Sequence, residues 1–458
     1  MKSKGLKYSR EDMIEFIALA LVYGFIFFTM FYADLTVTLQ FSMTYIDSLF
    51  DGKFASFYNN ALSTGIAPEG AVYDVGIYFI FAIWGLPVYI LNKLFHVSYL
   101  SVGSLLWFKL LLVVFAFAIK WVIEKIAEEV GIDAKKVGKW WLVSPLMVFP
   151  ALVAAQYDII PVFFMLLGVL YAIKDEKLKC VLFFSISFIM KPISLIGFVI
   201  VLLIKEKKIV DIIKYGILSV VPILVCKLIY MINPVNNPTN NDFVAMNLKG
   251  LFDVGIDLGN EKISLFILVF FLICAFCFMY KPKENRESDG KYLIWCLYLV
   301  WLSFCVFTSV YPYWIIYMAP FIILISFFSK DGINKILIME SIASIGFILV
   351  LTYKYTWVYG GSKTYSYLLL QNIYVNKQDV STVAGALNAL GLGSFMSAIY
   401  AVVVGAFLVI AYKGYISLKH DEKENNESEK ICSLQWWVKI AFLCAWCVLT
   451  LLILLISN

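Results

Sequence analysis

The chain has 458 residues, of which 62% are hydrophobic, 17% aromatic and only 15% charged, with a mean hydropathy of +0.85 and a net charge of +5. Soluble proteins are roughly 45–50% apolar and about 25% charged, so this composition excludes a soluble protein and predicts an all-α polytopic membrane protein. The 37 basic residues lie in short loops rather than in one patch, which excludes a nucleic-acid partner. Only two histidines occur, His96 and His420, so a cluster of histidine metal ligands is also excluded.

The first apolar run, Met13–Phe31, follows four basic residues, which places the N-terminus in the cytoplasm. The next run, Val75–Leu91, contains Gly85 and Pro87 and fits a segment that lies in the outer interface rather than a span. Twelve later runs are expected to span the bilayer: Val102–Val122, Trp140–Ala155, Ile159–Ile173, Leu178–Met190, Ile193–Ile204, Ile209–Met231, Ile263–Tyr280, Tyr292–Ser309, Trp314–Phe328, Ile336–Tyr353, Phe395–Tyr412 and Trp436–Ile456.

The distribution of positive charge decides this topology of thirteen spans with the C-terminus outside. Of the lysines and arginines, 26 then fall on the inner side, eight on the outer side and three within helices. If residues 75–91 spanned instead, the lysine-rich loop 120–139 and every later loop would change sides. Because cytoplasmic loops carry the excess of Lys and Arg, we expect residues 75–91 to be interfacial.

The chain is expected to be a single transmembrane domain, residues 1–458, in the cell membrane. A first extracytoplasmic loop at 34–101 carries surface helices, and further outer loops are expected at 233–262 and 354–394. The polar stretch 413–433 reads as a cytoplasmic linker. The long polar segments therefore lie mostly outside the cytoplasm.

Three polar residues near the predicted outer ends of the spans are candidates for chemistry. Asp34 directly follows the first span, where a solvated helix end is the alternative to a catalytic carboxylate. Gln156 and Asp158 lie in a turn between two apolar runs. A carboxylate in that position is costly unless it faces a polar cavity, so Asp158 has a functional interpretation beside that of a solvated helix end.

Two further outer segments add candidates. The first outer loop places Glu69 and Asp74 next to apolar and aromatic segments. A loop that only connected two helices would not need carboxylates there. A tight aromatic turn later in the chain either anchors it in the interface through Trp314 or contacts a sugar or a phosphate through Tyr311 and Tyr313.

Three lysines lie at a similar predicted depth. Lys191 occupies a proline-broken turn between two short helices, whereas Lys109 and Lys227 lie toward the outer ends of their helices. Each of the latter two can simply extend to the interface. Three ammonium groups at one depth also suit a phosphate.

In this order, the segments resemble the GT-C superfamily of multispanning glycosyltransferases, and within it the mannosyltransferase-like bacterial branch. The matching features are an early acidic residue in the first outer loop, a glutamine/aspartate turn, a lysine-proline turn and an aromatic-proline-aromatic turn: Asp34, Gln156–Asp158, Lys191-Pro192 and Tyr311–Trp314. The resemblance extends to about residue 330. The chain departs from the family pattern in having a single acidic residue after the first helix and no Lys-Pro-Pro-type turn near Glu69.

The resemblance implies transfer of a sugar from a polyprenyl-phosphate donor to a hydroxyl of a glycan, glycolipid or protein at the extracytoplasmic face, with inversion. It implies Asp34 as general base. The residues expected to bind the donor phosphate are Lys191, Lys109, Lys227 and Tyr313. The residues expected to bind the sugar or the acceptor are Asp158, Gln156, Glu69, Asp74 and Tyr311.

Two alternatives remain open at this point: a flippase or transporter of lipid-linked sugars, and a non-catalytic relative that binds a prenyl lipid. No cofactor is implied, and a weakly bound divalent cation is neither required nor excluded. Ionisable residues gather near the predicted outer face rather than at the bilayer midplane, where a transporter needs them. This placement favours an enzyme.

Overall fold

The computed structural model describes residues 10–30, 34–64, 73–231, 249–282, 285–309, 311–328, 332–359, 382–420 and 431–456. These residues are almost entirely helical and include one antiparallel hairpin, β1 (Gly255–Asp257) and β2 (Lys262–Ser264). Eight of the described helices are long and apolar enough to cross a membrane, and shorter apolar helices accompany them. The predicted class, an all-α polytopic membrane protein, is confirmed.

The long helices share a high hydropathy and at least 20 residues. They are α1 (Arg10–Thr29), α4 (Val75–Phe95), α5 (Val102–Glu129), α11 (Ile209–Met231), α14 (Arg286–Phe307), α16 (Ile333–Lys354), α19 (Met396–His420) and α20 (Leu434–Ile456). Shorter helices between them are α2 (Asp34–Phe50), α3 (Phe57–Ser63), α6 (Ala134–Val143), α7 (Pro145–Val148), α8 (Ile159–Ile173), α9 (Lys177–Met190), α10 (Leu195–Lys205), α13 (Leu265–Met279), α15 (Ala319–Ser326) and α18 (Val383–Ala389).

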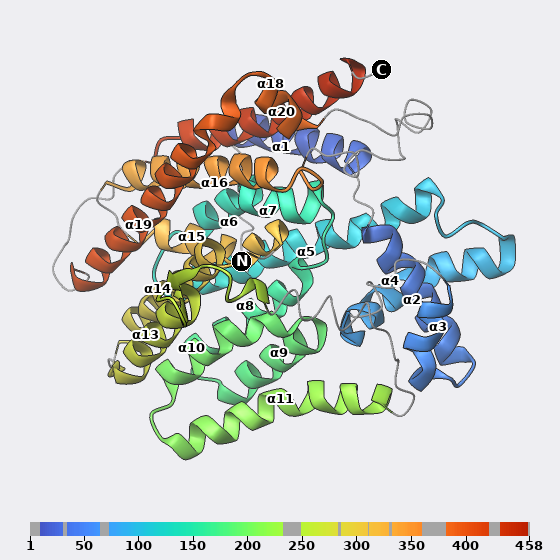
Figure 1. Ribbon diagram of the computed structural model, residues 1–458, viewed down its shortest axis with the longest axis horizontal. Coiled ribbons are helices and arrows are strands. Elements are labelled where there is room, and N and C mark those ends of the chain that lie inside the picture. The colour runs from blue at the N-terminus through green and yellow to red at the C-terminus, as the bar shows by residue number, and fades with distance from the viewer. Residues whose placement is uncertain are drawn as a thin grey trace, which may run out of the picture.

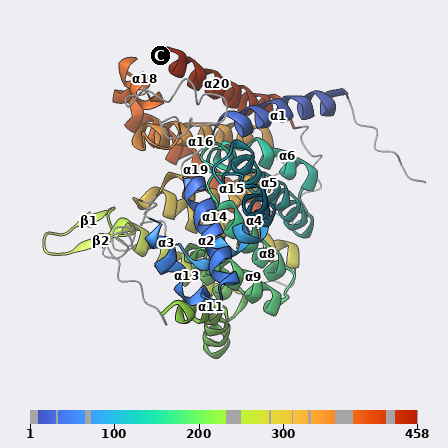
Figure 2. The same ribbon diagram turned by 90° about the vertical axis from the view of Figure 1, so that its right-hand side faces the viewer.

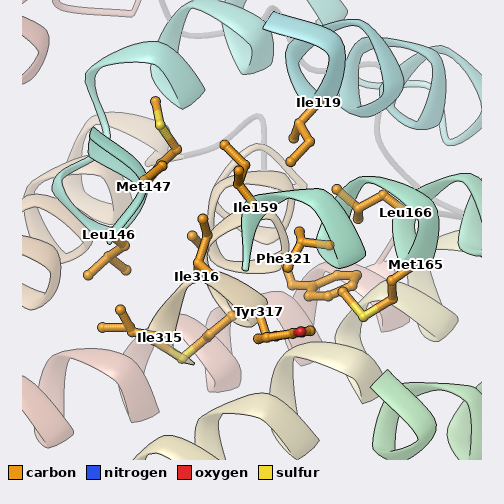
Figure 3. Close-up of a cluster of buried hydrophobic side chains, with 14 of the residues drawn as sticks. Ile119, Leu146, Met147, Ile159, Met165, Leu166, Ile315, Ile316, Tyr317 and Phe321 are labelled. Carbon is orange, nitrogen blue, oxygen red and sulfur yellow. The ribbon is translucent and has the colours of Figure 1, made fainter. Parts of the chain in front are cut away.

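The helices form one body in which α1, α16 and α20 lie together on one side and α11 on the opposite side (Figures 1 and 2). The β1–β2 hairpin projects from this body (Figure 2). Between the two sides, buried apolar side chains of α5, α7, α8 and the segment from η5 (Pro312–Tyr317) to α15 meet in a common core (Figure 3). These helices therefore hold the turns at the start of α8 and in η5 in fixed positions.

The expected span Trp140–Ala155 is wrong as a single helix. The chain instead forms α6, α7 and a π-helical turn, η3 (Phe149–Val153). Pro145 is the first residue of α7, and Pro150 is the second residue of η3. Proline has no backbone N–H to donate and clashes with the preceding turn, which explains the breaks. The segment reaches Asp158 as an irregular chain.

Other boundaries also differ from those expected. The expected span Trp314–Phe328 is divided between η5 and α15, α5 continues to Glu129, and α14 begins at Arg286. Asp34 begins α2 rather than simply following the first span. Helix α4 continues to Phe95 and, at 21 residues, is long and apolar enough to cross a membrane, so its interfacial location stays a prediction. Helix α19 continues to His420, which makes the first part of the expected 413–433 linker helical.

Salt bridges cluster in the loops that were expected to face the cytoplasm. They join α1 to α6, α5 to both α8 and α14, and α9 to the end of α10: Glu15–Lys139, Glu129–Lys174, Glu129–Arg286 and Glu206–Lys177. Pairs of this kind add little stability when exposed. These pairs instead indicate where the loops lie, because each pair joins residues at the same end of the bundle.

A buried ion pair joins α16 to α20. Lys439 donates to Glu340, and both side chains are fully buried. The second carboxylate oxygen of Glu340 has no hydrogen-bond partner among the described residues. Desolvation of two charges opposes their attraction, so the pair is expected to matter most when one member is removed.

We therefore expect Lys439→Met to destabilise the protein by roughly 3–5 kcal/mol, because it leaves a buried carboxylate without a counter-charge. The double variant Glu340→Met/Lys439→Met removes both charges and should recover most of that loss. Thermal unfolding in detergent, followed by tryptophan fluorescence, measures both. A double variant as unstable as the single one would contradict this account.

Candidate active site

An irregular turn positions Gln156 and Asp158. It follows the π-helical turn η3 and precedes α8, and within it Ala155 has a φ of 48°. A left-handed conformation costs an alanine about 1–2 kcal/mol, and such strain is often retained at functional sites. Gln156 and Asp158 are 1% and 0% exposed, so both side chains need partners inside the protein.

Those partners come from two distant parts of the chain. The Gln156 Nε2 donates to Oδ2 of Asp34 at 2.9 Å, and the Lys191 Nζ donates to Oδ1 of Asp158 at 2.5 Å. Oδ2 of Asp158 is buried and receives no hydrogen bond within the described part of the chain. The turn thus joins α2 to the α9–α10 break and leaves one buried carboxylate oxygen of Asp158 without a hydrogen bond from a described residue.

Aromatic rings surround the Lys191 ammonium. Its Nζ lies 4.7 Å from the ring centroid of Trp314, 5.1 Å from that of Tyr157 and 5.7 Å from that of Tyr313. Ring faces attract a cation, and more strongly when water is excluded. Because the Lys191 side chain is only 12% exposed, these rings and the Asp158 carboxylate fix the ammonium in one place.

Several carboxylates act on this lysine. Burial lowers the pKa of Lys191, and the carboxylates of Asp158, Asp34 and Asp74 act against that shift. Burial also raises the pKa of Asp74 to about 6, opposed by Lys227 and Lys191. Lys227 Nζ lies 3.4 Å from Oδ1 of Asp74. Five predicted site residues are therefore close enough to influence one another electrostatically.

A cavity of about 600 Å³ opens beside these groups, between α10, α11, α13 and α14. One part of its wall is polar or charged: Asp74, Lys191, Lys227, Tyr311 and Tyr313. Another part is apolar: Leu195, Ile196, Val199, Phe270 and Phe304. A cavity divided in this way suits an amphiphile with an anionic head and an apolar chain.

Two predicted site residues do not join this group. Lys109 is fully buried, and its ammonium donates to the carbonyls of Ile26 and Met30 at the end of α1. It therefore neutralises the carboxyl end of that helix, as a cation is expected to do. Lys109 therefore caps α1 in this structure and lies outside the described cavity wall, and its predicted contact with a phosphate stays a prediction. Glu69 lies outside the described residues.

The sequence did not identify every residue at the site. Trp314 was favoured as an interfacial anchor, but its ring faces Lys191 and lines the cavity. Tyr157 and Tyr73 also line it, with their rings packed edge to face at 5.3 Å. The sequence feature that could have identified Tyr157 is its position between Gln156 and Asp158. Among the described residues, no group of three His, Cys, Asp or Glu is placed to hold a metal ion.

One comparison with known proteins bears on this site. A model of the family described as Alpha-(1->6)-mannopyranosyltransferase, N-terminal domain, matches residues 76–206, less than a third of the chain. The matched stretch includes Asp158 and Lys191 but neither Asp34 nor the aromatic turn. No curated protein and no solved structure matches the chain. The match supports a glycosyltransferase and is consistent with a GT-C-like mannosyltransferase.

The raised pKa of Asp74 gives a test of the site's electrostatics. A carboxyl group whose pKa rises from 3.8 to about 6 on folding binds its proton more tightly in the folded state. Lowering the pH from 7 through 6 should therefore stabilise wild type relative to Asp74→Asn, and this gain should level off below the unfolded pKa. Melting temperatures of both proteins across this pH range measure the difference. A difference that does not change with pH would contradict the burial of Asp74.

Proposed function

We propose that the protein is a glycosyltransferase that moves a sugar from a polyprenyl-phosphate donor to an acceptor hydroxyl. The observation that carries the proposal is the cavity in which Lys191 and Lys227 line one part and apolar side chains of α10 and α13 line another. A prenyl phosphate has the same division, with an anionic phosphate joined to a long apolar chain. The mannopyranosyltransferase match supports the reaction class.

In the proposed reaction, Asp34 is the general base. An acceptor hydroxyl has a pKa far above neutral, and proton transfer to a positioned carboxylate is worth roughly 10²–10⁴-fold in rate. Gln156 fixes one oxygen of Asp34 through its 2.9 Å hydrogen bond. As the acceptor oxygen bonds to the anomeric carbon, its proton passes to Asp34.

The bond between the anomeric carbon and the phosphate oxygen breaks at the same time, and the prenyl phosphate leaves with the bonding electrons. Attack from the side opposite the phosphate inverts the anomeric configuration. Lys191 and Lys227 stabilise the leaving phosphate, as a lysine ammonium does through its charge. Tyr311 and Tyr313 line the cavity and contact the sugar in this proposal. Asp158 is not part of the described cavity wall, and its part is to hold Lys191 in place.

Asp74 is a second carboxylate at this site. Among the described residues, the cavity wall includes Asp74 but not Asp34. Its proximity to Lys227 suits a role in holding that lysine toward the donor phosphate. The variants Asp34→Asn and Asp74→Asn distinguish the two roles. Loss of the general base, Asp34, removes proton transfer, whereas loss of Asp74 removes only the partner of Lys227.

We further propose that the N-terminus is cytoplasmic and that the site faces the outside of the cell membrane. The salt-bridged basic loops at one end of the bundle support this orientation, because cytoplasmic loops carry the excess of basic residues. Asp158 and Lys191 lie at the other ends of α8 and α9, away from those loops. The donor head group would then lie at the outer interface.

The first test compares wild type with Asp34→Asn and Asp51→Asn in nanodiscs with a panel of radiolabelled polyprenyl-phosphate hexoses. We expect Asp34→Asn to lower sugar transfer by at least about 100-fold, because the base is lost. Asp51 is exposed just beyond α2 and serves as the matched control with unchanged transfer. Wild-type turnover by Asp34→Asn would remove Asp34 from this role. Donor binding without turnover by wild type would favour a flippase or a binding protein instead.

The second test measures donor affinity. Lys191→Gln should weaken binding of a polyprenyl-phosphate hexose by about tenfold or more, because a hydrogen bond to a charged group is worth roughly 1.5–3 kcal/mol. Lys93 pairs with Asp47 on the surface and is 52% exposed, so Lys93→Gln is the control. Equal affinities of the two variants would rule out Lys191 as the phosphate ligand.

A further inference from the structure

A second cavity, of about 440 Å³, lies directly beside the candidate active site. It is lined by residues of α14, η5, α16 and α19. Three side chains line both cavities: Phe304, Tyr311 and Trp314. The proposed donor occupies only the first cavity, so the second has no assigned occupant.

The wall of the second cavity is mostly apolar. Phe347, Val350 and Leu351 line it from α16, and Met396 lines it from the start of α19. Two of its tyrosines have their hydroxyl groups engaged, since Tyr400 donates to Val306 at 3.3 Å and Tyr353 to Asn388 at 3.0 Å. Few polar groups are therefore left to bind a ligand.

Two of the remaining polar groups bear on the choice of ligand. Lys354 lines the cavity, is exposed, and forms no salt bridge with any described residue, although its Nζ lies 5.3 Å from the ring centroid of Tyr355. The indole N–H of Trp314 is buried and has no hydrogen-bond partner in the described part of the chain. Because the Trp314 N–H has almost no accessible surface, Lys354 is the group that a ligand in this cavity reaches, and its ammonium calls for an anionic partner.

We propose that this second cavity binds an anionic membrane lipid that serves as the acceptor or as its anchor. The anionic head lies on Lys354, and the apolar part lies against Phe347, Leu351 and Met396. The reacting hydroxyl passes Trp314 toward the donor cavity. The acceptor role rests on the proposed glycosyltransferase activity, whereas binding of the lipid does not.

The walls favour a lipid over a soluble glycan. A glycan needs many hydrogen-bonding groups to replace its water, and this wall offers few. Helices α16 and α19 are both long and apolar enough to cross a membrane. An acyl chain that lies against the cavity wall formed by these helices therefore remains in an apolar environment when it leaves the bilayer.

The binding test uses phosphatidylglycerol and phosphatidylcholine as probes, with retention by the purified full chain measured by native mass spectrometry. We expect preferential retention of phosphatidylglycerol, lowered about tenfold by Lys354→Gln. Lys335→Gln is the control, because Lys335 is exposed near the opposite end of α16. Equal retention of the two lipids, or equal retention by the two variants, would overturn the proposal. Competition by inorganic phosphate alone would show a free-phosphate site and would overturn the lipid assignment.

A space-filling variant separates the two cavities. Leu351→Trp fills the second cavity, whereas Ile342→Trp adds the same bulk to an exposed position of the same helix. We expect Leu351→Trp to lose lipid retention and sugar transfer while donor affinity stays unchanged, and Ile342→Trp to keep all three. Retained lipid binding in Leu351→Trp would refute the cavity assignment. Absence of any transfer by wild type would instead count against the glycosyltransferase proposal. The retention of lipid by wild type and Leu351→Trp would still test whether the second cavity binds lipid.

Discussion

The arrangement of the site depends on the cost of burying Asp158. Its carboxylate has no exposed surface, and a charge in such a place is tolerated only when it is paired and hydrogen-bonded. Lys191 supplies the counter-charge, and the rings of Tyr157 and Trp314 complete the surroundings of the ammonium. The rings of Tyr157, Tyr313 and Trp314 lie against this ammonium and line the cavity, so this part of the cavity wall depends on the pair.

Breaks in the helices make that pairing possible. The turn that carries Asp158 follows a π-helical turn with Pro150, Lys191 precedes Pro192, and Trp314 follows Pro312. A continuous helix in a membrane satisfies its own backbone and points its side chains outward from the axis. A broken one directs side chains along the axis instead, at the price of backbone groups that the surrounding protein must satisfy. Two of these groups are satisfied locally, because the Gln156 N–H donates to the Pro150 carbonyl and the Ser194 hydroxyl donates to the Lys191 carbonyl.

The sequence predicted the features that depend on composition and on the free-energy cost of placing a charge beside an apolar run. Apolar length gave the helical membrane class, and charges placed beside apolar runs identified Asp158 and Lys191. Contacts between distant segments had no such signal, as with Gln156 and Asp34, which are 122 residues apart. The local sequence around Lys109 does not determine the role of this residue. A lysine that caps another helix and one that binds a phosphate have the same local sequence pattern, and only the position of α1 distinguishes them.

Trp314 links the two cavities through three separate features. Its ring lies against the Lys191 ammonium, its side chain lines both cavities, and its indole N–H is buried without a partner among the described residues. In a closely packed interior, a side chain shared by two cavities cannot move for one ligand without changing the space available to the other. The Lys191 ammonium and the rings of Phe304 and Tyr311 hold the indole of Trp314 in one position. The same residue therefore preserves the shape of the donor cavity and of the cavity beside it.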